Sequence, residues 1–264
     1  MLRDITIGQY YSVSSPIHKM DPRFKIVASM LYLVSLFLIK DVIAYVAIIA
    51  FIGSVVKISK VPFNFILKGL KPVFMLIVFA FLINVFLTTG EGEPLFKFGF
   101  IKVYLEGIDR AVFMAVRLIL LIIGTSLLTL TTSPIELTDG IEYLLNPFKR
   151  IGLPAHELAM MMTIALRFIP TLLEETDKIM KAQMARGADF ESGNIMSRAK
   201  ALIPLLVPLF ISAFRRADEL AMAMEARCYR GGEGRTRMKV LKYTRLDVLG
   251  AFVMVVYLAV CVII

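Results

Sequence analysis

The sequence predicts an all-α, polytopic membrane protein with about five transmembrane helices and a large cytoplasmic helical domain. Two observations support this fold class. Apolar residues make up 58% of the 264 residues and mean hydropathy is +0.76, whereas soluble domains are roughly 45–50% apolar. The apolar residues also form continuous runs, which indicates helices, because in lipid only helices and closed barrels satisfy the backbone.

Five apolar runs are candidate spans. They cover Phe24–Ile39, Val42–Val56, Pro72–Thr88, Ala111–Leu130 and Leu246–Ile264. The first two are short for a hydrocarbon core of about 30 Å, so they form either a tight hairpin or a partly re-entrant pair. We therefore expect an N-terminal membrane domain over residues 1–131, a cytoplasmic domain over 132–245, and a C-terminal span over 246–264.

Lysine and arginine residues near the ends of these runs predict the orientation, because cytoplasmic loops carry an excess of both. The N-terminal segment and the loop after the second run are basic, with Arg3, Lys19, Arg23, Lys25, Lys57, Lys60, Lys68 and Lys71. The loop after the third run carries Glu91, Glu93, Glu106 and Asp109 against Lys97, Lys102 and Arg110. We expect a cytoplasmic N-terminus and an external C-terminus. The net charge of +9 then reflects topology and does not call for a nucleic-acid partner.

The segment between Thr131 and Arg245 is apolar enough to pack but too charged to span. It predicts two long helices, at about residues 155–186 and 195–227. Pro170 interrupts the first helix and Pro204 and Pro208 interrupt the second, because proline removes a backbone donor. Gly187 is placed to end the first helix.

The two helices end alike. A shift of 41 residues aligns Thr176–Gly187 (TDKIMKAQMARG) with Ala217–Cys228 (ADELAMAMEARC). The aligned endings are Ala185-Arg186-Gly187 and Ala226-Arg227-Cys228. A planar arginine fork beside a small residue suits a carboxylate on a closely approaching partner. Each arginine alone would also complement the helix dipole, but the recurrence favours two similar sockets on a partner.

The same alignment predicts a contact between the helices. It sets Glu174 and Glu175 opposite Arg215 and Arg216. If the helices cross there, these side chains form a charge-complementary contact, although exposed pairs contribute only about 0–1 kcal/mol each.

Catalytic chemistry is not indicated. The sequence has no Gly-x-x-x-x-Gly-Lys-Ser/Thr loop for phosphates and no evident nucleophile, base and orienting group. Its two histidines, His18 and His156, lie in unrelated contexts, so we expect neither a metal site nor a cofactor. Arg117 lies within the fourth apolar run, where a charge marks either a functional site or a position close to the interface.

Three segments together resemble one known family. They are Ser14–Lys25 (SSPIHKMDPRFK), the stretch GLPAHELAMMMTIALRFIPTLLEE before Ala185, and the paired Ala-Arg endings. They resemble the transmembrane T-component of energy-coupling factor (ECF) transporters, which are ATP-driven vitamin and trace-nutrient importers of prokaryotes. Asp21, Pro22 and Arg23 match the family's Asp-Pro-Arg motif. Cys228 departs from the commoner glycine, so either glycine is not required there or the second helix ends differently.

The resemblance implies a non-catalytic scaffold in the cell membrane. It implies that the two triplets bind two ABC ATPase subunits, as a homo- or heterodimer, with Arg186 and Arg227 in grooves of those subunits. Long crossed coupling helices would then transmit ATPase movement to a separate substrate-binding (S) component in the membrane.

Two alternatives remain open from the sequence. One is a T-component dedicated to a single substrate such as cobalt, nickel or biotin. The other is a stand-alone secondary transporter, which would show inverted repeats, broken helices and buried ionisable groups. The sequence shows none of these features clearly.

Overall fold

The structure is a computed structural model that describes residues 10–39, 41–88, 96–98, 101–188, 190, 194–232, 234 and 240–263. The described residues fall into two compact units. The membrane unit lies within Gly8–Ile141 and Val240–Ile264, and the two-helix unit lies within Glu142–Lys239. The division falls inside α6 (Pro134–Leu145), so the start of this helix belongs to the membrane unit.

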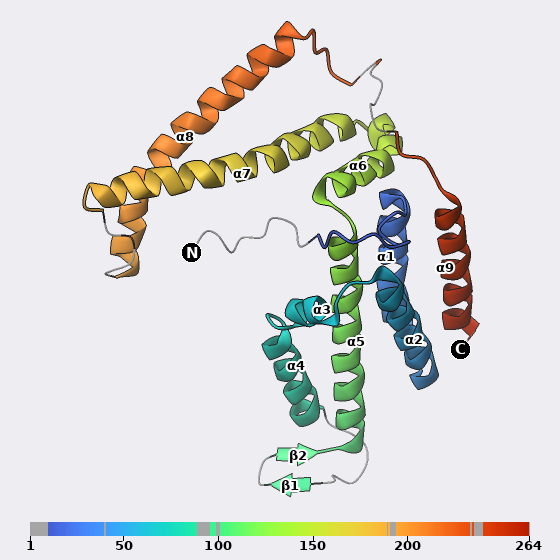
Figure 1. Ribbon diagram of the computed structural model, residues 1–264. Coiled ribbons are helices and arrows are strands. Elements are labelled where there is room, and N and C mark those ends of the chain that lie inside the picture. Colours follow the sequence, from blue (N-terminus) through green and yellow to red (C-terminus); the bar gives the residue numbers. More distant parts are fainter. Residues whose placement is uncertain are drawn as a thin grey trace. The chain divides into compact units, whose positions relative to one another are not determined.

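Helix α5 is the centre of the membrane unit (Figure 1). The helices of the membrane unit are α1 (Pro22–Leu38), α2 (Val42–Ser59), α3 (Phe63–Leu70), α4 (Phe74–Leu87), α5 (Leu105–Thr131) and α9 (Arg245–Ile263). The first four pack against α5, and α9 packs against α1 and α2. A short antiparallel hairpin, β1 (Phe96–Phe98) with β2 (Ile101–Val103), precedes α5. Glu91 and Glu93 of the expected outer loop lie outside the described residues.

A close approach between α1 and α5 organises the core of the membrane unit. A Cβ atom at Gly124 would lie 2.2 Å from Tyr32 Cε1, so only glycine leaves room for this ring. The buried Tyr32 hydroxyl donates a hydrogen bond to the Leu120 carbonyl at 2.9 Å. Ser35 Oγ and Tyr257 Oη, 2.8 Å apart, join α1 to α9. The hydroxyls of Tyr32, Ser35 and Tyr257 therefore each have a partner, as a low-dielectric interior favours.

The predicted fold class is confirmed: among the described residues, four helices are long and apolar enough to cross a membrane, or five if the bent pair of α3 and α4 counts as one span. One of the four is the helix Ala155–Ala185, which the sequence analysis places in the cytoplasmic domain, whereas α1 is not among them. The third predicted span has a different form, because α3 and α4 are a pair bent by 59°, and the 14 residues of α4 are too few to cross alone. Large apolar side chains face outward from the unit, among them Met75, Phe79 and Phe252. Such exposure is unfavourable in water and suits lipid.

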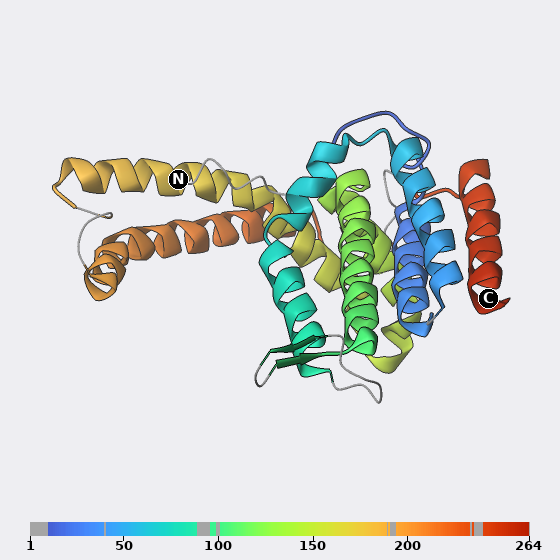
Figure 2. The ribbon, with the colours of Figure 1, turned by 90° about the horizontal axis from the view of Figure 1, so that it is seen from below.

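The two-helix unit consists of a 3-10 turn (Asn146–Ile151) and the long helices α7 (Ala155–Ala185) and α8 (Ile195–Ala226). These helices are antiparallel. Glu175 contacts Ser212 and Arg216, whereas Gln183, further along α7, contacts Pro204, earlier in α8. Figure 2 shows the two helices side by side, and Figure 1 shows them crossing and then diverging.

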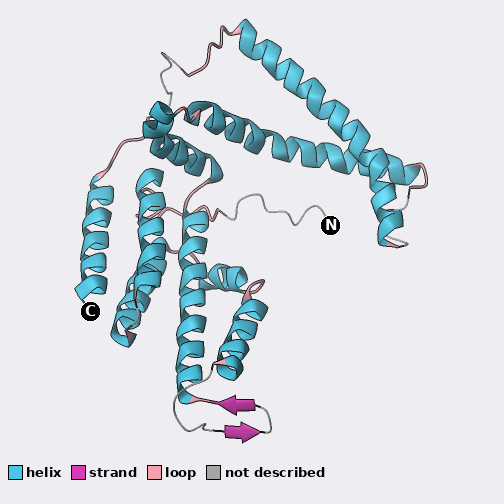
Figure 3. Ribbon diagram, turned by 180° about the vertical axis from the view of Figure 1, so that it is seen from behind, coloured by secondary structure: helices cyan, strands magenta, loops and turns pink. Residues whose placement is uncertain are grey.

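Helix α8 changes direction in its first half (Figures 1 and 3). Pro204 and Pro208 lie inside this helix and account for the bend. Because Pro208 has no N–H, the Pro204 carbonyl loses its partner within the helix. This carbonyl instead accepts a long hydrogen bond of 3.5 Å from Gln183 Nε2 of α7. The bend therefore also supplies a contact between the helices.

Candidate functional site: the two helix tips

The end of α7 is a Schellman turn. Arg186 is the C-cap residue and Gly187, at φ +89°, is the left-handed residue after it. The Ala188 N–H donates to the Gln183 carbonyl at 2.9 Å, and the Gly187 N–H donates to the Met184 carbonyl at 3.0 Å. These two bonds define the Schellman motif, which fixes the chain direction immediately after Arg186.

The end of α8 repeats this turn bond for bond. Arg227 is the C-cap residue. The Tyr229 N–H donates to the Met224 carbonyl at 3.0 Å, and the Cys228 N–H donates to the Glu225 carbonyl at 2.8 Å. Cys228 takes the left-handed position at φ +55°. Of the two possibilities left by the sequence, the structure shows the first: the helix ends in the same way without glycine.

Both arginines are free to meet a partner. Arg186 and Arg227 are exposed, as are the alanines before them. Within the described part of the chain, neither guanidinium has a hydrogen-bond or ion-pair partner. Because the helices are antiparallel, the two tips lie at opposite ends of the pair. The two tips therefore have the same backbone geometry but form two separate exposed surfaces.

Glu175 and Arg216 form the polar contact between the helices. Arg216 Nη2 and Nε donate to Glu175 Oε2 at 3.0 and 3.2 Å, and the Ser212 hydroxyl donates to Glu175 Oε1. The Ser212 hydrogen bond, followed by that of Arg216, holds the pKa of Glu175 below its usual value. The predicted neighbours Glu174 and Arg215 are exposed, and no contact joins them among the described residues.

A double-mutant cycle measures this contact. We expect Glu175→Arg and Arg216→Glu each to destabilise the full-length chain, and the combination to recover about 0.2–1 kcal/mol, because the pair is partly exposed. The measurement is the free energy of denaturant unfolding. Glu174→Arg with Arg215→Glu is the matched control and should show no coupling. Equal coupling in the two cycles would contradict the assignment.

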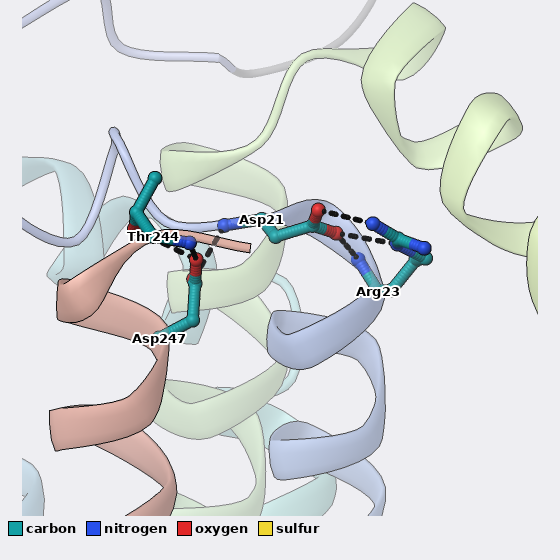
Figure 4. A network of polar contacts seen from close by, with 4 residues as sticks. All are labelled: Asp21, Arg23, Thr244 and Asp247. Carbon is teal, nitrogen blue, oxygen red and sulfur yellow. Dashed lines mark hydrogen bonds and ion pairs between the residues drawn. The ribbon is translucent and has the colours of Figure 1, made fainter. Parts of the chain in front are cut away.

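The N-terminal motif forms a buried polar cluster in the membrane unit (Figure 4). Arg23 donates to both oxygens of Asp21, at 3.0 Å to Oδ1 and 2.8 Å to Oδ2, and the Arg23 N–H also donates to Oδ1. The Asp21 N–H donates to Asp247 Oδ1 of α9 at 2.7 Å. Asp247 Oδ2 accepts from the N–H and the hydroxyl of Thr244. The motif thereby joins the starts of α1 and α9.

The rest of the motif joins this cluster to the end of α5. Lys25 Nζ donates to the Thr131 carbonyl at 2.9 Å and to the His18 carbonyl at 3.2 Å. His18 Nε2 lies 3.0 Å from the Tyr11 carbonyl, which can only accept, so Nε2 carries the proton. His18 Nδ1 then accepts from the Ser15 hydroxyl at 2.7 Å. Burial lowers the pKa of His18, which favours this neutral form.

Similarity to known proteins covers nearly the whole chain. The CbiQ family model, described as "Cobalt transport protein", matches residues 13–238. The "Energy-coupling factor transporter transmembrane protein EcfT" of Clostridium kluyveri is 64% identical, over 94% of this chain and 92% of that protein. The protein of the same name from Bacillus subtilis is 53% identical, over 94% of this chain and 93% of its own. This chain belongs to the CbiQ/EcfT family. It is therefore a transmembrane component of the ECF transporter class and is embedded in a membrane.

Sequence reasoning missed several residues that complete the polar contacts of this EcfT-family chain. Asp247 and Thr244 complete the N-terminal cluster, and Ser212 completes the Glu175 contact. Asp247 follows a basic loop at the start of the last apolar run, and an acid there signals a helix N-terminus. Its partner, 226 residues away, leaves no local sign. The sequence around Ser212 contains no signal that this side chain forms a contact with another helix.

Arg117, the charge within α5, has a structural role in this EcfT-family chain. Its Nε donates to the Tyr45 hydroxyl at 2.9 Å, and Nη2 donates to the Ile39 carbonyl at 3.1 Å. Ile39 caps the end of α1, where helix carbonyls lack internal partners. Arg117 therefore ties α5 to the α1–α2 turn.

The left-handed residue of the second tip yields a stability prediction. Cys228→Gly is expected to stabilise the EcfT-family chain by about 1 kcal/mol, because a side chain at positive φ strains the backbone. Gly187→Ala at the equivalent position of α7 should destabilise it by about the same amount. Thermal unfolding of full-length protein in detergent measures both changes. A fall in stability for Cys228→Gly would mean that the thiol makes a favourable contact.

Proposed function

We propose that the chain is the energy-coupling subunit of an ECF-type importer of vitamins or trace nutrients. It binds two ABC ATPase subunits, one at each tip, and transmits their ATP-driven movement to a separate substrate-binding membrane protein. The observation that carries this proposal is the pair of matching Schellman tips, each presenting an arginine that is exposed and unpaired among the described residues.

The spacing of the tips supports binding of two subunits at once. The 31 and 32 residues of α7 and α8 correspond to helices of about 45 Å at 1.5 Å per residue. Since the helices are antiparallel and in contact near Glu175 and Gln183, Arg186 and Arg227 are separated by a large part of that length. A single small groove would not accept both tips, whereas two subunits would.

The helices suit the transmission of movement. Each is a long helix, α8 with a bend in its first half, and the contact of Glu175 with Ser212 and Arg216 fixes α7 against the part of α8 that follows this bend. Displacement of a tip by a closing ATPase therefore moves the other end of the same helix. Helix α8 also exposes a large apolar surface, including Phe210, Ile211 and Phe214. We assign this surface to contact with the substrate-binding membrane protein, because contiguous exposed apolar patches mark interaction sites.

The chain itself is proposed to be non-catalytic and to need no cofactor. It carries no phosphate-binding loop, so the partner ATPases hydrolyse ATP. The proposed orientation follows the basic residues: the N-terminus and the two-helix unit are cytoplasmic and the C-terminus is outside.

Reconstitution tests this proposal. Proteoliposomes that contain this chain, two ABC ATPases and a substrate-binding membrane protein should accumulate substrate only when ATP is supplied. Omitting the chain should abolish uptake while the ATPases still bind nucleotide. Uptake driven by an ion gradient through the chain alone would contradict the proposal and support a secondary transporter.

The family model's description as a cobalt transport protein favours a second candidate, a T-component dedicated to one substrate. The same uptake assay distinguishes a shared from a dedicated T-component when the substrate-binding protein is exchanged. A shared subunit supports uptake with several such proteins, whereas a dedicated one works with a single protein.

A further inference from the structure

The membrane unit contains a partly open cavity of about 250 Å³ that the coupling role does not use. Its walls come from α1, α2, α5 and α9 and from the segment before α1. The wall of α1 includes Ala28, that of α2 includes Phe51, and that of α9 includes Val253. Almost all of the lining is carbon. A cavity of this composition does not hold ordered water, because water needs two or more polar partners.

The shape of the cavity is fixed by aromatic rings that pack on glycines. Tyr32 packs on Gly124 of α5, and a Cβ atom at Gly250 of α9 would lie 2.8 Å from Phe24 Cε1. The two rings reach across from α1 and occupy the space where side chains of α5 and α9 would otherwise lie. The cavity is thus part of the packing of four helices and is not a loose surface groove.

Exposed cations flank the lining of the cavity. Lys19 precedes Met20, Lys57 precedes Ile58 and Arg245 precedes Leu246, and the second residue of each pair lines the cavity. Two of the acids at the same end, Asp21 and Asp247, are buried and already hydrogen-bonded, and a third, Glu136, is close enough to act on Lys25 of the lining. An apolar cavity whose lining residues have exposed basic residues as sequence neighbours matches a ligand with a hydrocarbon chain and an anionic head.

We propose that this cavity binds one acyl chain of an anionic phospholipid, with the phosphate against Lys19, Lys57 and Arg245. The chain is embedded in a membrane, so acyl chains surround the unit at high concentration. Anionic headgroups at the surface add attraction to each nearby lysine or arginine. The site would keep α9 packed against α1 and α2.

Fluorescence quenching tests the proposal, because the chain contains no tryptophan. Phe51→Trp places a single reporter in the cavity wall, and Phe79→Trp places one on a surface of α4 that is 65% exposed. The full-length variants are reconstituted in phosphatidylcholine vesicles that contain increasing fractions of brominated phosphatidylglycerol or brominated phosphatidylcholine. Quenching of the Phe51→Trp reporter should saturate at a mole fraction about five-fold lower for phosphatidylglycerol, which is the effect of about one basic residue near the lipid. Quenching of the Phe79→Trp reporter should rise smoothly and equally for both lipids.

Matched substitutions distinguish lipid bound in the cavity from lipid at the outer surface of the protein. In the Phe51→Trp background, Ala28→Phe fills the cavity and should remove the saturating component. Ala50→Phe, on an exposed part of α2 outside the lining, should leave it intact. The combination of Lys19→Gln, Lys57→Gln and Arg245→Gln changes only exposed residues and should abolish the five-fold preference even if Ala28→Phe fails to fold. The proposal is overturned if the two reporters behave alike, if the two headgroups quench equally, or if only a free brominated fatty acid saturates the site.

Discussion

Charge reversal at both tips, Arg186→Glu with Arg227→Glu, is expected to abolish ATP-driven uptake by the assembled transporter. Each guanidinium is exposed and has no partner among the described residues, so its hydrogen-bonding capacity is available to a partner subunit. Hydrogen bonds to a charged group contribute about 1.5–3 kcal/mol. Loss of one such contact should weaken ATPase binding about ten-fold or more, and the reversed charge should add repulsion.

The measurements are ATPase recovery after co-purification and uptake in proteoliposomes. Each single reversal should reduce recovery, and the double reversal should eliminate uptake. Arg215→Glu is the control, because Arg215 is an exposed arginine of the same helix but lies away from the tip. If Arg215→Glu were as damaging as Arg227→Glu, the effect would come from general charge and not from the tip.

Asp21→Ala should give the largest loss of stability. Asp21 and Arg23 are each only 6% exposed, and the Asp21 carboxylate accepts from Arg23 three times. Removal of the carboxylate takes three hydrogen bonds and one ion pair from the buried Arg23, and breaking a buried pair in this way costs about 3–5 kcal/mol. The measurement is the unfolding free energy of the full-length chain in detergent.

Asp41→Ala is the control for this substitution. Asp41 also precedes a helix, but it makes no side-chain cap bond and is exposed, so we expect a change within about 0.5 kcal/mol. A comparable loss at Asp41 would show that any aspartate at a helix start matters, and would contradict a special role for the buried cluster.

Lowering the pH should reduce the difference in unfolding free energy between the wild-type chain and Asp21→Ala. Burial acts to raise the pKa of Asp21, but the hydrogen bonds and charge of Arg23 outweigh it and lower this pKa overall. A lowered carboxyl pKa stabilises the fold above the usual carboxyl range, and the benefit is lost as pH falls through the native value. The difference should therefore be full at pH 7 and shrink below about pH 4. A difference independent of pH would contradict the ion pair.

The sequence predicted the helices well because their signals are local. Apolar runs and the positions of Pro170, Pro204 and Pro208 predicted α7, α8 and most of the membrane helices. The bend between α3 and α4 was not predicted, because Gly69 and the short basic stretch near Lys71 look like an ordinary loop before a span.

Tertiary contacts were harder to predict because they join distant residues. The Ala-Arg repeat located the two tips, but not their placement at opposite ends of an antiparallel pair. The Asp-Pro-Arg motif drew attention to Asp21 through family resemblance alone. Its partner in α9, Asp247, comes from the other end of the chain, and no pattern within either segment identifies it.

Photo-cross-linking at the two tips tests the central claim most directly. Met184 and Glu225 are exposed and occupy equivalent positions of the two Schellman turns, and Met162 is an exposed site in the first half of α7. With a photoreactive phenylalanine at each position in turn, we predict cross-links to an ATPase subunit from positions 184 and 225 but not from 162. Absence of ATPase cross-links from both tips, with an assembled and active complex, would contradict the account.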